Sequence, residues 1–505
     1  MICMTAGNRK AGKRSQIWLL ALAFISGFAV MVVEVCGARL LAPYLGDTLF
    51  SWTSSIAVVL AALGIGYMAG GALADRRTDA RHLSAVAVLG GLSILLMLLI
   101  STPVLEYGAS FGLEYGPLVA SVLLFALPNV FLGMVTPYAV RLRSCAVGRV
   151  GEDVGIVYSV ATAGSITGAL SSGYILIPYV GIMQSFFLSG VALMLAGLAL
   201  SLGRRYLALV VVAVLAYQFV PNFTVHYSGA RVLYQADTPY YHLGVVNSSG
   251  VLELITNLDI QSLAPSQGAP GTYYGYQGIV YRQTGVENAL YLGLGGGEMV
   301  DELYYSTNAS IDVVEIDPSV IWAAKTYFGL PNSSRIRVYN EDGRFFLRNS
   351  NRTYGMIVMD AYGGSYQIPY QLLTLQAFQE MKAHLTANGS LLINLVSPAA
   401  GGNASVFKSV YRTLGLVFPD VYVFPLNPNL MALQNIVIIA NSDNWTSQGL
   451  GAALNESIGR NLSYEMALEQ HFNKTSVNAS AYPVLTDNVD PYDIYIAQAL
   501  AGYGR

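Results

Sequence analysis

The fold is decided by the stretch Ala289-Leu-Tyr-Leu-Gly-Leu-Gly-Gly-Gly-Glu-Met-Val-Asp-Glu-Leu303, which is followed by Ile311-Asp-Val-Val-Glu315. Its apolar start predicts a strand that runs into a glycine-rich loop, and a helix is expected from Glu298. The glycines of the G-x-G-x-G pattern are Gly293, Gly295 and Gly297. Glycines let the backbone approach a ligand, a helix start offers free N–H groups, and an acid ending the next strand, here Glu315, accepts ribose hydroxyls. The stretch therefore predicts a Rossmann-like nucleoside site, and its G-x-G-x-G spacing fits pyrophosphate dinucleotides less well.

Two more predicted strands end in carboxylates. Residues 336–340 lead to Asp342, and residues 354–359 lead to Asp360. Ligands of open parallel sheets bind at the carboxyl ends of the strands. We therefore expect Glu315, Asp342 and Asp360 to converge on one pocket.

Upstream of this unit, short alternating segments from about residue 237 predict a small antiparallel sheet. They lie at 242–246, 252–256 and 259–261. We therefore expect a small β-domain over 222–285 and a Rossmann-like domain over 286–505. Residues 400–480, rich in Asn, Gly, Ser and Thr, are expected to form a rim rather than a catalytic element.

The composition of the first part of the chain requires lipid. Only 11% of the 505 residues are charged and 54% are hydrophobic, whereas an average soluble domain is about 25% charged. The apolar runs precede residue 222, and most reach the roughly 20 residues that cross a bilayer as a helix. We predict a helical membrane domain over 1–221 with about seven spans, at 17–43, 53–74, 83–101, 117–140, 154–178, 182–202 and 206–221.

Charge and glycosylation signals predict the sidedness. Arginines follow the second, fourth and sixth spans, while the alternate loops have no Lys or Arg, so the positive-inside rule places the N-terminus in the cytoplasm. Seven crossings then place the C-terminal domain outside a cell membrane. Twelve Asn-X-Ser/Thr sequons, all after residue 221, predict N-linked glycans there. They are Asn222, Asn247, Asn308, Asn332, Asn351, Asn388, Asn403, Asn444, Asn455, Asn461, Asn473 and Asn478.

Other classes of partner are disfavoured. A net charge of −3 argues against a nucleic-acid partner. The three cysteines, Cys3, Cys36 and Cys145, all lie in the first half, so no cysteine-based metal site is available to the second half, and we expect no metal. We expect the lipid bilayer as a partner, and a homo-oligomer.

Taken together, the motifs resemble the spermidine synthase (polyamine aminopropyltransferase) family. The resemblance lies in Gly293-Leu-Gly-Gly-Gly, Val313-Val-Glu-Ile-Asp-Pro, Glu341-Asp-Gly-Arg-Phe-Phe, Val358-Met-Asp-Ala-Tyr, Leu372-Leu-Thr-Leu-Gln-Ala-Phe and Leu485-Thr-Asp-Asn-Val-Asp-Pro. Asp237-Thr-Pro-Tyr-Tyr-His with Leu258-Asp-Ile-Gln resembles the family's N-terminal β-domain, and Glu34 to Arg76 resembles the membrane half of transmembrane-fused members. The resemblance implies a methyltransferase-type Rossmann fold.

It also implies a role for each matching residue. Asp360 would accept a proton from the attacking amine, with Tyr276 beside it in the catalytic set. Decarboxylated S-adenosylmethionine, or a related nucleoside, would be the co-substrate, and a small amine or polyamine the acceptor. The nucleoside would be held by Gly293, Gly295, Gly297, Glu298, Glu315, Asp342 and Gln261, with Glu315 on the ribose, Asp342 on the adenine amino group, and Glu298 and Gln261 on the tail. The acceptor would meet Gln277, Tyr240 and Tyr362.

The sequence departs from the family pattern where the acceptor would bind. Acids of the family are replaced at Thr272-Tyr273, Gly278 and Gly363, and a polyamine site should be lined with carboxylates. Three hypotheses therefore stand. In the first, the chain is an aminopropyltransferase. In the second, it is an extracytoplasmic enzyme of the same fold with another reaction, with or without S-adenosylmethionine, on a secreted peptide or glycan. In the third, it is a transporter whose outer domain binds polyamines.

Overall fold

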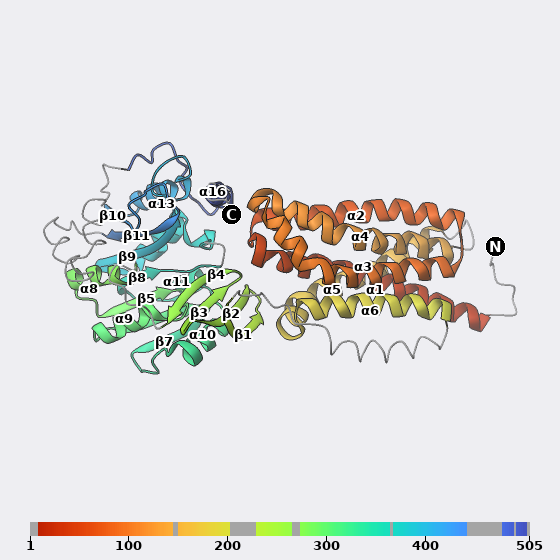
Figure 1. The fold of residues 1–505 in the computed structure, drawn as a ribbon, viewed down its shortest axis with the longest axis horizontal. Helices are drawn as coiled ribbons and strands as arrows, with labels where there is room; N and C mark the ends of the chain where they lie inside the picture. The colour runs from red at the N-terminus through yellow and green to blue at the C-terminus, as the bar shows by residue number, and fades with distance from the viewer. Residues whose placement is uncertain are drawn as a thin grey trace. The chain divides into compact units, whose positions relative to one another are not determined.

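The computed structural model describes residues 9–144, 150–202, 229–264, 273–363, 367–441, 477–488 and 491–501. The chain divides into two compact units, Met1–His226 and Tyr227–Arg505. The first unit is a bundle of long helices, and the second holds two β-sheets with helices around them (Figure 1).

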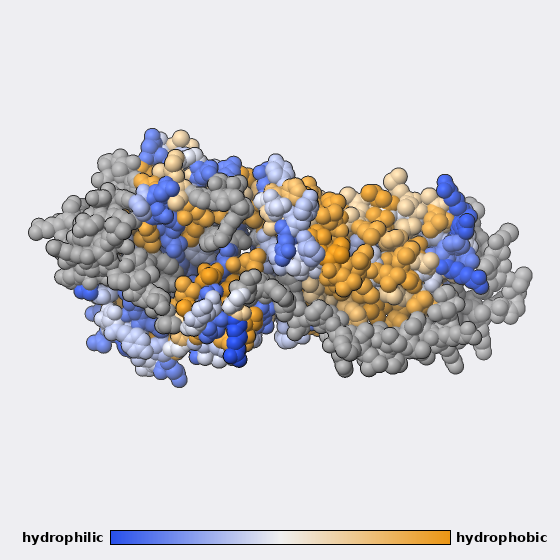
Figure 2. Space-filling view, viewed as in Figure 1, coloured by the Kyte–Doolittle hydropathy of each residue, from blue (hydrophilic) through white to orange (hydrophobic). Residues whose placement is uncertain are grey.

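Six helices of the first unit are long and apolar enough to cross a membrane. They are α1 (Arg9–Leu45), α2 (Leu49–Arg76), α3 (Ala80–Ala109), α4 (Gly112–Arg143), α5 (Val150–Ser171), which continues as the π-helical η2 (Ser172–Val180), and α6 (Ile182–Leu202). They coincide with the first six predicted spans, whereas the seventh, 206–221, lies outside the described residues. The outer surface of the helices is hydrophobic (Figure 2), and Leu99 and Met68 are 80% and 79% exposed, as lipid-facing side chains would be.

Glycines allow two helix pairs of this bundle to pack closely. A Cβ at Gly66 or Gly70 of α2 would collide with the backbone of α4, and one at Gly164 or Gly168 of α5 would collide with the backbone of α1. Membrane helices gain their association energy from such close contacts, since lipid is as apolar as their side chains. The small residues therefore serve helix packing.

The second unit begins with a four-stranded antiparallel sheet, as the alternating sequence predicts. Its strands β1 (Arg231–Asp237), β2 (His242–Ser248), β3 (Val251–Thr256) and β4 (Asp259–Ala264) are paired in chain order. A 3-10 turn, η4 (Tyr273–Tyr276), and helix α8 (Gln277–Thr284) lead from this sheet to the next.

A seven-stranded sheet in the order β10-β11-β9-β8-β5-β6-β7 forms the centre of the unit. Its strands are β5 (Asn288–Leu292), β6 (Ser310–Glu315), β7 (Ile336–Asn340), β8 (Tyr354–Met359), β9 (Leu385–Ser397), β10 (Asp420–Pro425) and β11 (Gln434–Asn441). The five strands from β9 to β7 are parallel. Strand β11 pairs antiparallel with β9, and β10 pairs antiparallel with β11. Chain order reverses between β5 and β8, and such a switch point is where open α/β sheets bind ligands.

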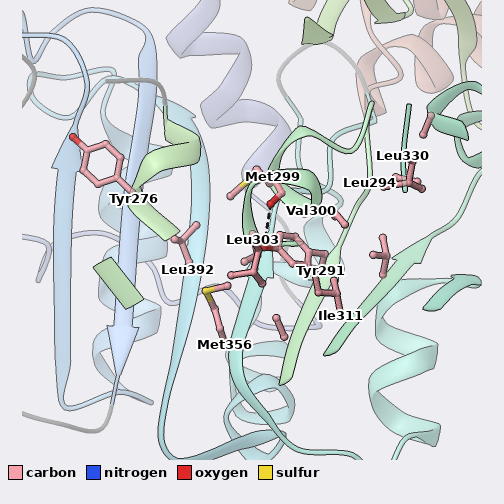
Figure 3. Close-up of a cluster of buried hydrophobic side chains, with 14 of the residues drawn as sticks. Tyr276, Tyr291, Leu294, Met299, Val300, Leu303, Ile311, Leu330, Met356 and Leu392 are labelled. Atoms are coloured by element: carbon pink, nitrogen blue, oxygen red, sulfur yellow. Dashed lines mark hydrogen bonds between the residues drawn. The ribbon is translucent and has the colours of Figure 1, made fainter. Parts of the chain in front are cut away.

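Helices and short helical turns connect these strands. They are α9 (Glu298–Ser306), α10 (Pro318–Ala323), η5 (Ala324–Phe328), α11 (Gly343–Asn349), η6 (Tyr370–Leu372), α12 (Leu375–Ala383), α13 (Ser405–Gly415) and α16 (Tyr492–Ala501). The expected rim over 400–480 is wrong for 405–441, because α13, β10 and β11 belong to the packed fold. A buried apolar cluster around Tyr291, Met299, Leu303 and Met356 joins α9 to the sheet (Figure 3).

Candidate active site

The glycine loop between β5 and α9 lies against the end of β8. Gly293 has a φ of +98°, which favours glycine, and a Cβ there would collide with the carbonyl oxygen of Asp360. The backbone N–H of Asp360 donates to the carbonyl of Leu292 at 3.0 Å. The glycine loop and Asp360, the predicted base, are therefore in backbone contact. A side chain at position 293 would prevent this contact.

Glu315 ties the end of β6 to this loop. One of its carboxylate oxygens accepts from the backbone N–H of Leu294 at 3.1 Å, and the other accepts from that of Asp317 at 2.9 Å. Burial raises the pKa of Glu315 to about 7, and the backbone hydrogen bonds oppose this rise. The carboxyl of Glu315 therefore lies against the glycine loop.

Strand β4 closes the loop from the four-stranded sheet. Ser262, buried on β4, accepts at its Oγ from the backbone N–H of Gly296 at 2.7 Å, and it also hydrogen-bonds Glu298. Gln261, half-buried, precedes it. Burial raises the pKa of Glu298 to about 7, and the charge of Asp360 adds to this rise. Glu298 and Asp360, from different elements, therefore face one another closely enough to interact electrostatically.

Asp360 itself is half-buried just past β8. The side-chain amide of Asn394, on the neighbouring strand β9, donates to its Oδ1 at 2.9 Å. Tyr362, two residues on, donates from its hydroxyl to the carbonyl of Asn394 at 2.8 Å and accepts from the N–H of Val396 at 3.0 Å. The Tyr362 hydroxyl is thus engaged in holding the loop to β9.

Asp342 caps helix α11. Its Oδ1 accepts from the backbone N–H groups of Arg344 and Phe345 at 3.0 and 2.9 Å, as an N-cap aspartate does. Burial raises the pKa of Tyr240, and the charges of Asp317, Asp342 and Glu315 raise it further. Tyr240 therefore lies near Asp317 and two of the three strand-end carboxyls, Asp342 and Glu315.

Tyr276 and Gln277 lie in the hydrophobic interior. Tyr276 (Figure 3) is 1% exposed. Its ring packs against Phe424 with centroids 5.4 Å apart, and burial raises its pKa. Gln277, fully buried, donates to the carbonyl of Met299 at 3.0 Å and to Glu302 at 3.1 Å, and accepts from the Tyr291 hydroxyl at 2.5 Å. The contacts of Gln277 fasten α8 to α9, the helix that follows the glycine loop.

Seven of the predicted glycosylation sites are among the described residues. Six of them are exposed and Asn247 is half-buried; the exposed ones are Asn308, Asn332, Asn351, Asn388, Asn403 and Asn478. The side chain of Asn247 accepts from the N–H of Gly250 at 2.9 Å. The other five, Asn222, Asn444, Asn455, Asn461 and Asn473, lie outside the described residues.

Residues 280–445 match the family described as the spermine/spermidine synthase domain. The chain is therefore similar to this family over these residues. A polyamine aminopropyltransferase of Vibrio vulnificus is 32% identical to it over 146 residues, which are 28% of this chain and 46% of that protein. Polyamine aminopropyltransferase 2 of Aquifex aeolicus is 22% identical over 428 residues, 80% of this chain and 83% of that one. The chain spans about half the length of the Vibrio vulnificus relative.

A solved structure of a probable spermidine synthase from Corynebacterium glutamicum is similar to 53% of this chain and 98% of its own, with 18% identity and a TM-score of 0.42. The second unit of this chain has a seven-stranded, parallel-rich sheet preceded by a small antiparallel one. Within the described parts of the chain, no group of three His, Cys, Asp or Glu side chains is arranged to hold a metal ion.

Two residues of the synthase domain site were missed in the sequence. Ser262 follows Gln261 in an edge strand and gave no signal of its own, since serine is common on strand surfaces. Asn394 was visible as the one polar residue in the run Leu391-Leu-Ile-Asn-Leu-Val396. A buried polar side chain in such a run requires a hydrogen-bond partner, and that partner is Asp360.

Proposed function

We propose that the chain is a membrane-anchored transferase that moves an aminopropyl group from decarboxylated S-adenosylmethionine to an amine. The observation that carries this proposal is the position of Asp360, whose backbone contacts the glycine loop at Gly293 and whose charge interacts with Glu298. A carboxylate beside a nucleoside-binding loop can accept the proton that an ammonium must lose to become a nucleophile.

The reaction balances without a further reactant. The amine nitrogen attacks the aminopropyl carbon bound to the sulfonium, the new N–C bond forms as the C–S bond breaks, and the sulfur takes the electron pair to leave as a neutral thioether. The proton released by the amine passes to the carboxylate of Asp360. Orientation of the two substrates supplies much of the rate in such a displacement.

The other site residues would hold the nucleoside. Glu315 would accept the ribose hydroxyls, Asp342 the adenine amino group, and Glu298 with Gln261 the ammonium of the aminopropyl tail. Their positions support this assignment, because Glu315 bonds the loop at Leu294 and Glu298 starts the helix that follows it. No metal is required by any of these contacts.

Calorimetry with purified full-length protein tests the nucleoside part. We expect decarboxylated S-adenosylmethionine to bind, and Glu315→Gln to weaken its binding by at least tenfold, as the loss of a hydrogen bond to a charged group would. Asp360→Asn should leave that binding within a few-fold and abolish release of the thioether nucleoside in the presence of putrescine. Absence of nucleoside binding would exclude aminopropyl transfer.

A second candidate is transfer to a different acceptor on the same nucleoside site. It is favoured by Gly363 and Gly278, which leave no carboxylate at these two positions, and by the open space that surrounds Gly363. A dication such as putrescine gains from paired carboxylates, whereas a monoamine or a peptide amine needs one base. Parallel assays with putrescine, monoamines and amine-bearing peptides separate the two, since only the first candidate requires putrescine to be the best substrate.

We also propose that the chain is a multi-pass protein of the cell membrane, with its N-terminus in the cytoplasm and its synthase domain outside. The six apolar helices support the membrane location. Sidedness depends on a seventh crossing over 206–221, together with the arginine loops and the sequons. Protease accessibility in intact cells tests it, because a protected synthase domain would reverse the assignment.

A further inference from the structure

The backbone of Asp360 is fixed before any substrate binds. Its N–H donates to the carbonyl of Leu292 at 3.0 Å, and its own carbonyl fills the space that a side chain at position 293 would need. The orientation of its carboxylate is a separate matter, because χ1 and χ2 of an aspartate remain free after the backbone is fixed.

The side chain of Asn394 restricts that freedom. Strands β8 and β9 are parallel, with Met359 opposite Ile393, so the next pair along the register is Asp360 and Asn394. The Asn394 amide donates to Oδ1 of Asp360 at 2.9 Å. The Tyr362 hydroxyl holds the Asn394 carbonyl at 2.8 Å, so this part of β9 is joined to the loop by side chain and backbone together.

The free-energy cost of burying the Asn394 amide indicates a role beyond packing. The residue is 3% exposed, between Ile393 and Leu395 in an apolar strand. Its Oδ1 is buried and has no hydrogen-bond partner among the described residues. A buried amide with an unsatisfied oxygen destabilises a fold relative to an apolar side chain of the same shape, such as leucine. The bond to Asp360 is the contact that an apolar residue would not reproduce.

We propose that Asn394 is a positioning residue for Asp360, which rests on the proposed function of Asp360 as the base. Its amide holds Oδ1 and thereby fixes the orientation in which the carboxylate meets the acceptor amine. A hydrogen bond donated to a carboxylate favours its charged form. Two other groups interact electrostatically with Asp360: Glu298, which faces it from α9, and Tyr362 on the same loop. The Asn394 amide offsets their effect on the carboxylate.

Steady-state kinetics with decarboxylated S-adenosylmethionine and putrescine test the proposal. Asn394→Leu should lower kcat by roughly 10- to 100-fold and leave the KM for the nucleoside unchanged. Asn394→Asp, which keeps the shape of the side chain, should move the acidic limb of the pH profile of kcat/KM upward by about one unit or more, because two carboxylates then share one site. Asn435→Asp, on the neighbouring strand β11 and half-buried, is the control with the same change in charge.

Infrared difference spectroscopy gives a readout that does not depend on turnover. The carboxylate band that Asp360→Asn removes belongs to Asp360, and its titration can be followed in each variant. We expect the midpoint to rise in Asn394→Asp and not in Asn435→Asp. An unchanged midpoint in Asn394→Asp would overturn the proposal even in an active enzyme. A raised midpoint in a protein that transfers no aminopropyl group would support the positioning role and reject the proposed function instead.

Discussion

Arg344 and Asp487, 143 residues apart in the chain, form a two-bond ion pair with N···O distances of 2.6 and 2.8 Å. Arg344 also donates to Glu380 at 2.9 Å and to the carbonyl of Gln371 at 2.9 Å, and its side chain is 7% exposed. Its backbone N–H is one of the two that Asp342 caps. The C-terminal segment therefore fixes the helix turn that orients Asp342.

We predict that Arg344→Met destabilises the protein by about 3 kcal/mol, because removing one member of a buried pair leaves its partners without compensation. Nucleoside binding should weaken as well, since Asp342 loses its support. Thermal unfolding of the full-length protein and calorimetry measure the two effects. Arg348→Met is the matched control. Arg348 contacts Glu380 at 3.0 Å but is 56% exposed, so its loss should cost less than about 1 kcal/mol.

Equal losses in the two variants would show that the buried pair contributes nothing beyond surface charge. A large loss of stability with unchanged nucleoside binding would show that Asp342 is oriented by the α11 backbone alone.

The sequence predicted the parallel strands and the acids at their ends, because apolar strands followed by acidic turns are a local pattern. It did not predict the contact between Asp360 and Asn394, since that contact depends on β9 lying beside β8, and strand order is not a local property. The partners of Gln277 escaped prediction for a related reason. Met299 and Glu302 come from a helix that follows later in the chain, and the contact of Gln277 with the acceptor stays a prediction.

The rim expected over 400–480 shows a different limit. Residues 420–425 and 434–441 extend the seven-stranded sheet as β10 and β11, although sequons and small polar residues surround them. Composition averaged over the whole segment concealed two short apolar strands, of which β11 pairs with β9 and β10 pairs with β11.

Gly293 offers a test of the loop geometry. We predict that Gly293→Ala lowers nucleoside affinity and activity by more than tenfold, because the added Cβ displaces the carbonyl of Asp360 and the φ of +98° is strained for alanine. Gly329→Ala separates the two causes. Gly329 has a φ of +78° but nothing within 4 Å of the added Cβ, so it should cost about 1 kcal/mol of stability and leave affinity unchanged. Equal affinities in both variants would mean that the contact with Asp360 does not shape the site.

The carboxyl of Glu302 predicts a pH dependence of stability. Burial raises its pKa to about 7, against a hydrogen bond from Gln277 that lowers it. A raised pKa means that the folded state binds the proton more tightly than the unfolded state, so this stability is complete below about pH 4.5 and is lost as the pH rises to about 7. The loss is at most about 3 kcal/mol from this shift.

We therefore predict that Glu302→Gln, which cannot ionise, is more stable than the parent protein at pH 8 and not at pH 4.5. Melting temperatures across this range measure the difference. Glu287→Gln, at an exposed position, should follow the parent curve. A parallel shift of the Glu302→Gln curve at every pH would assign its effect to packing rather than to ionisation.

The exposed sequons test the sidedness of the synthase domain. If this domain lies outside a cell that glycosylates asparagine, we predict that glycosidase treatment lowers the mass of its peptides at exposed sites such as Asn332 and Asn388. Asn247 is half-buried and its side chain accepts from Gly250, so it should be occupied less. Asn332→Gln with Asn388→Gln should remove the corresponding mass without changing the melting temperature by more than the small effects typical of surface substitutions. Unmodified asparagines at every exposed sequon, in a host with the glycosylation system, would contradict the outside assignment and favour the cytoplasmic side.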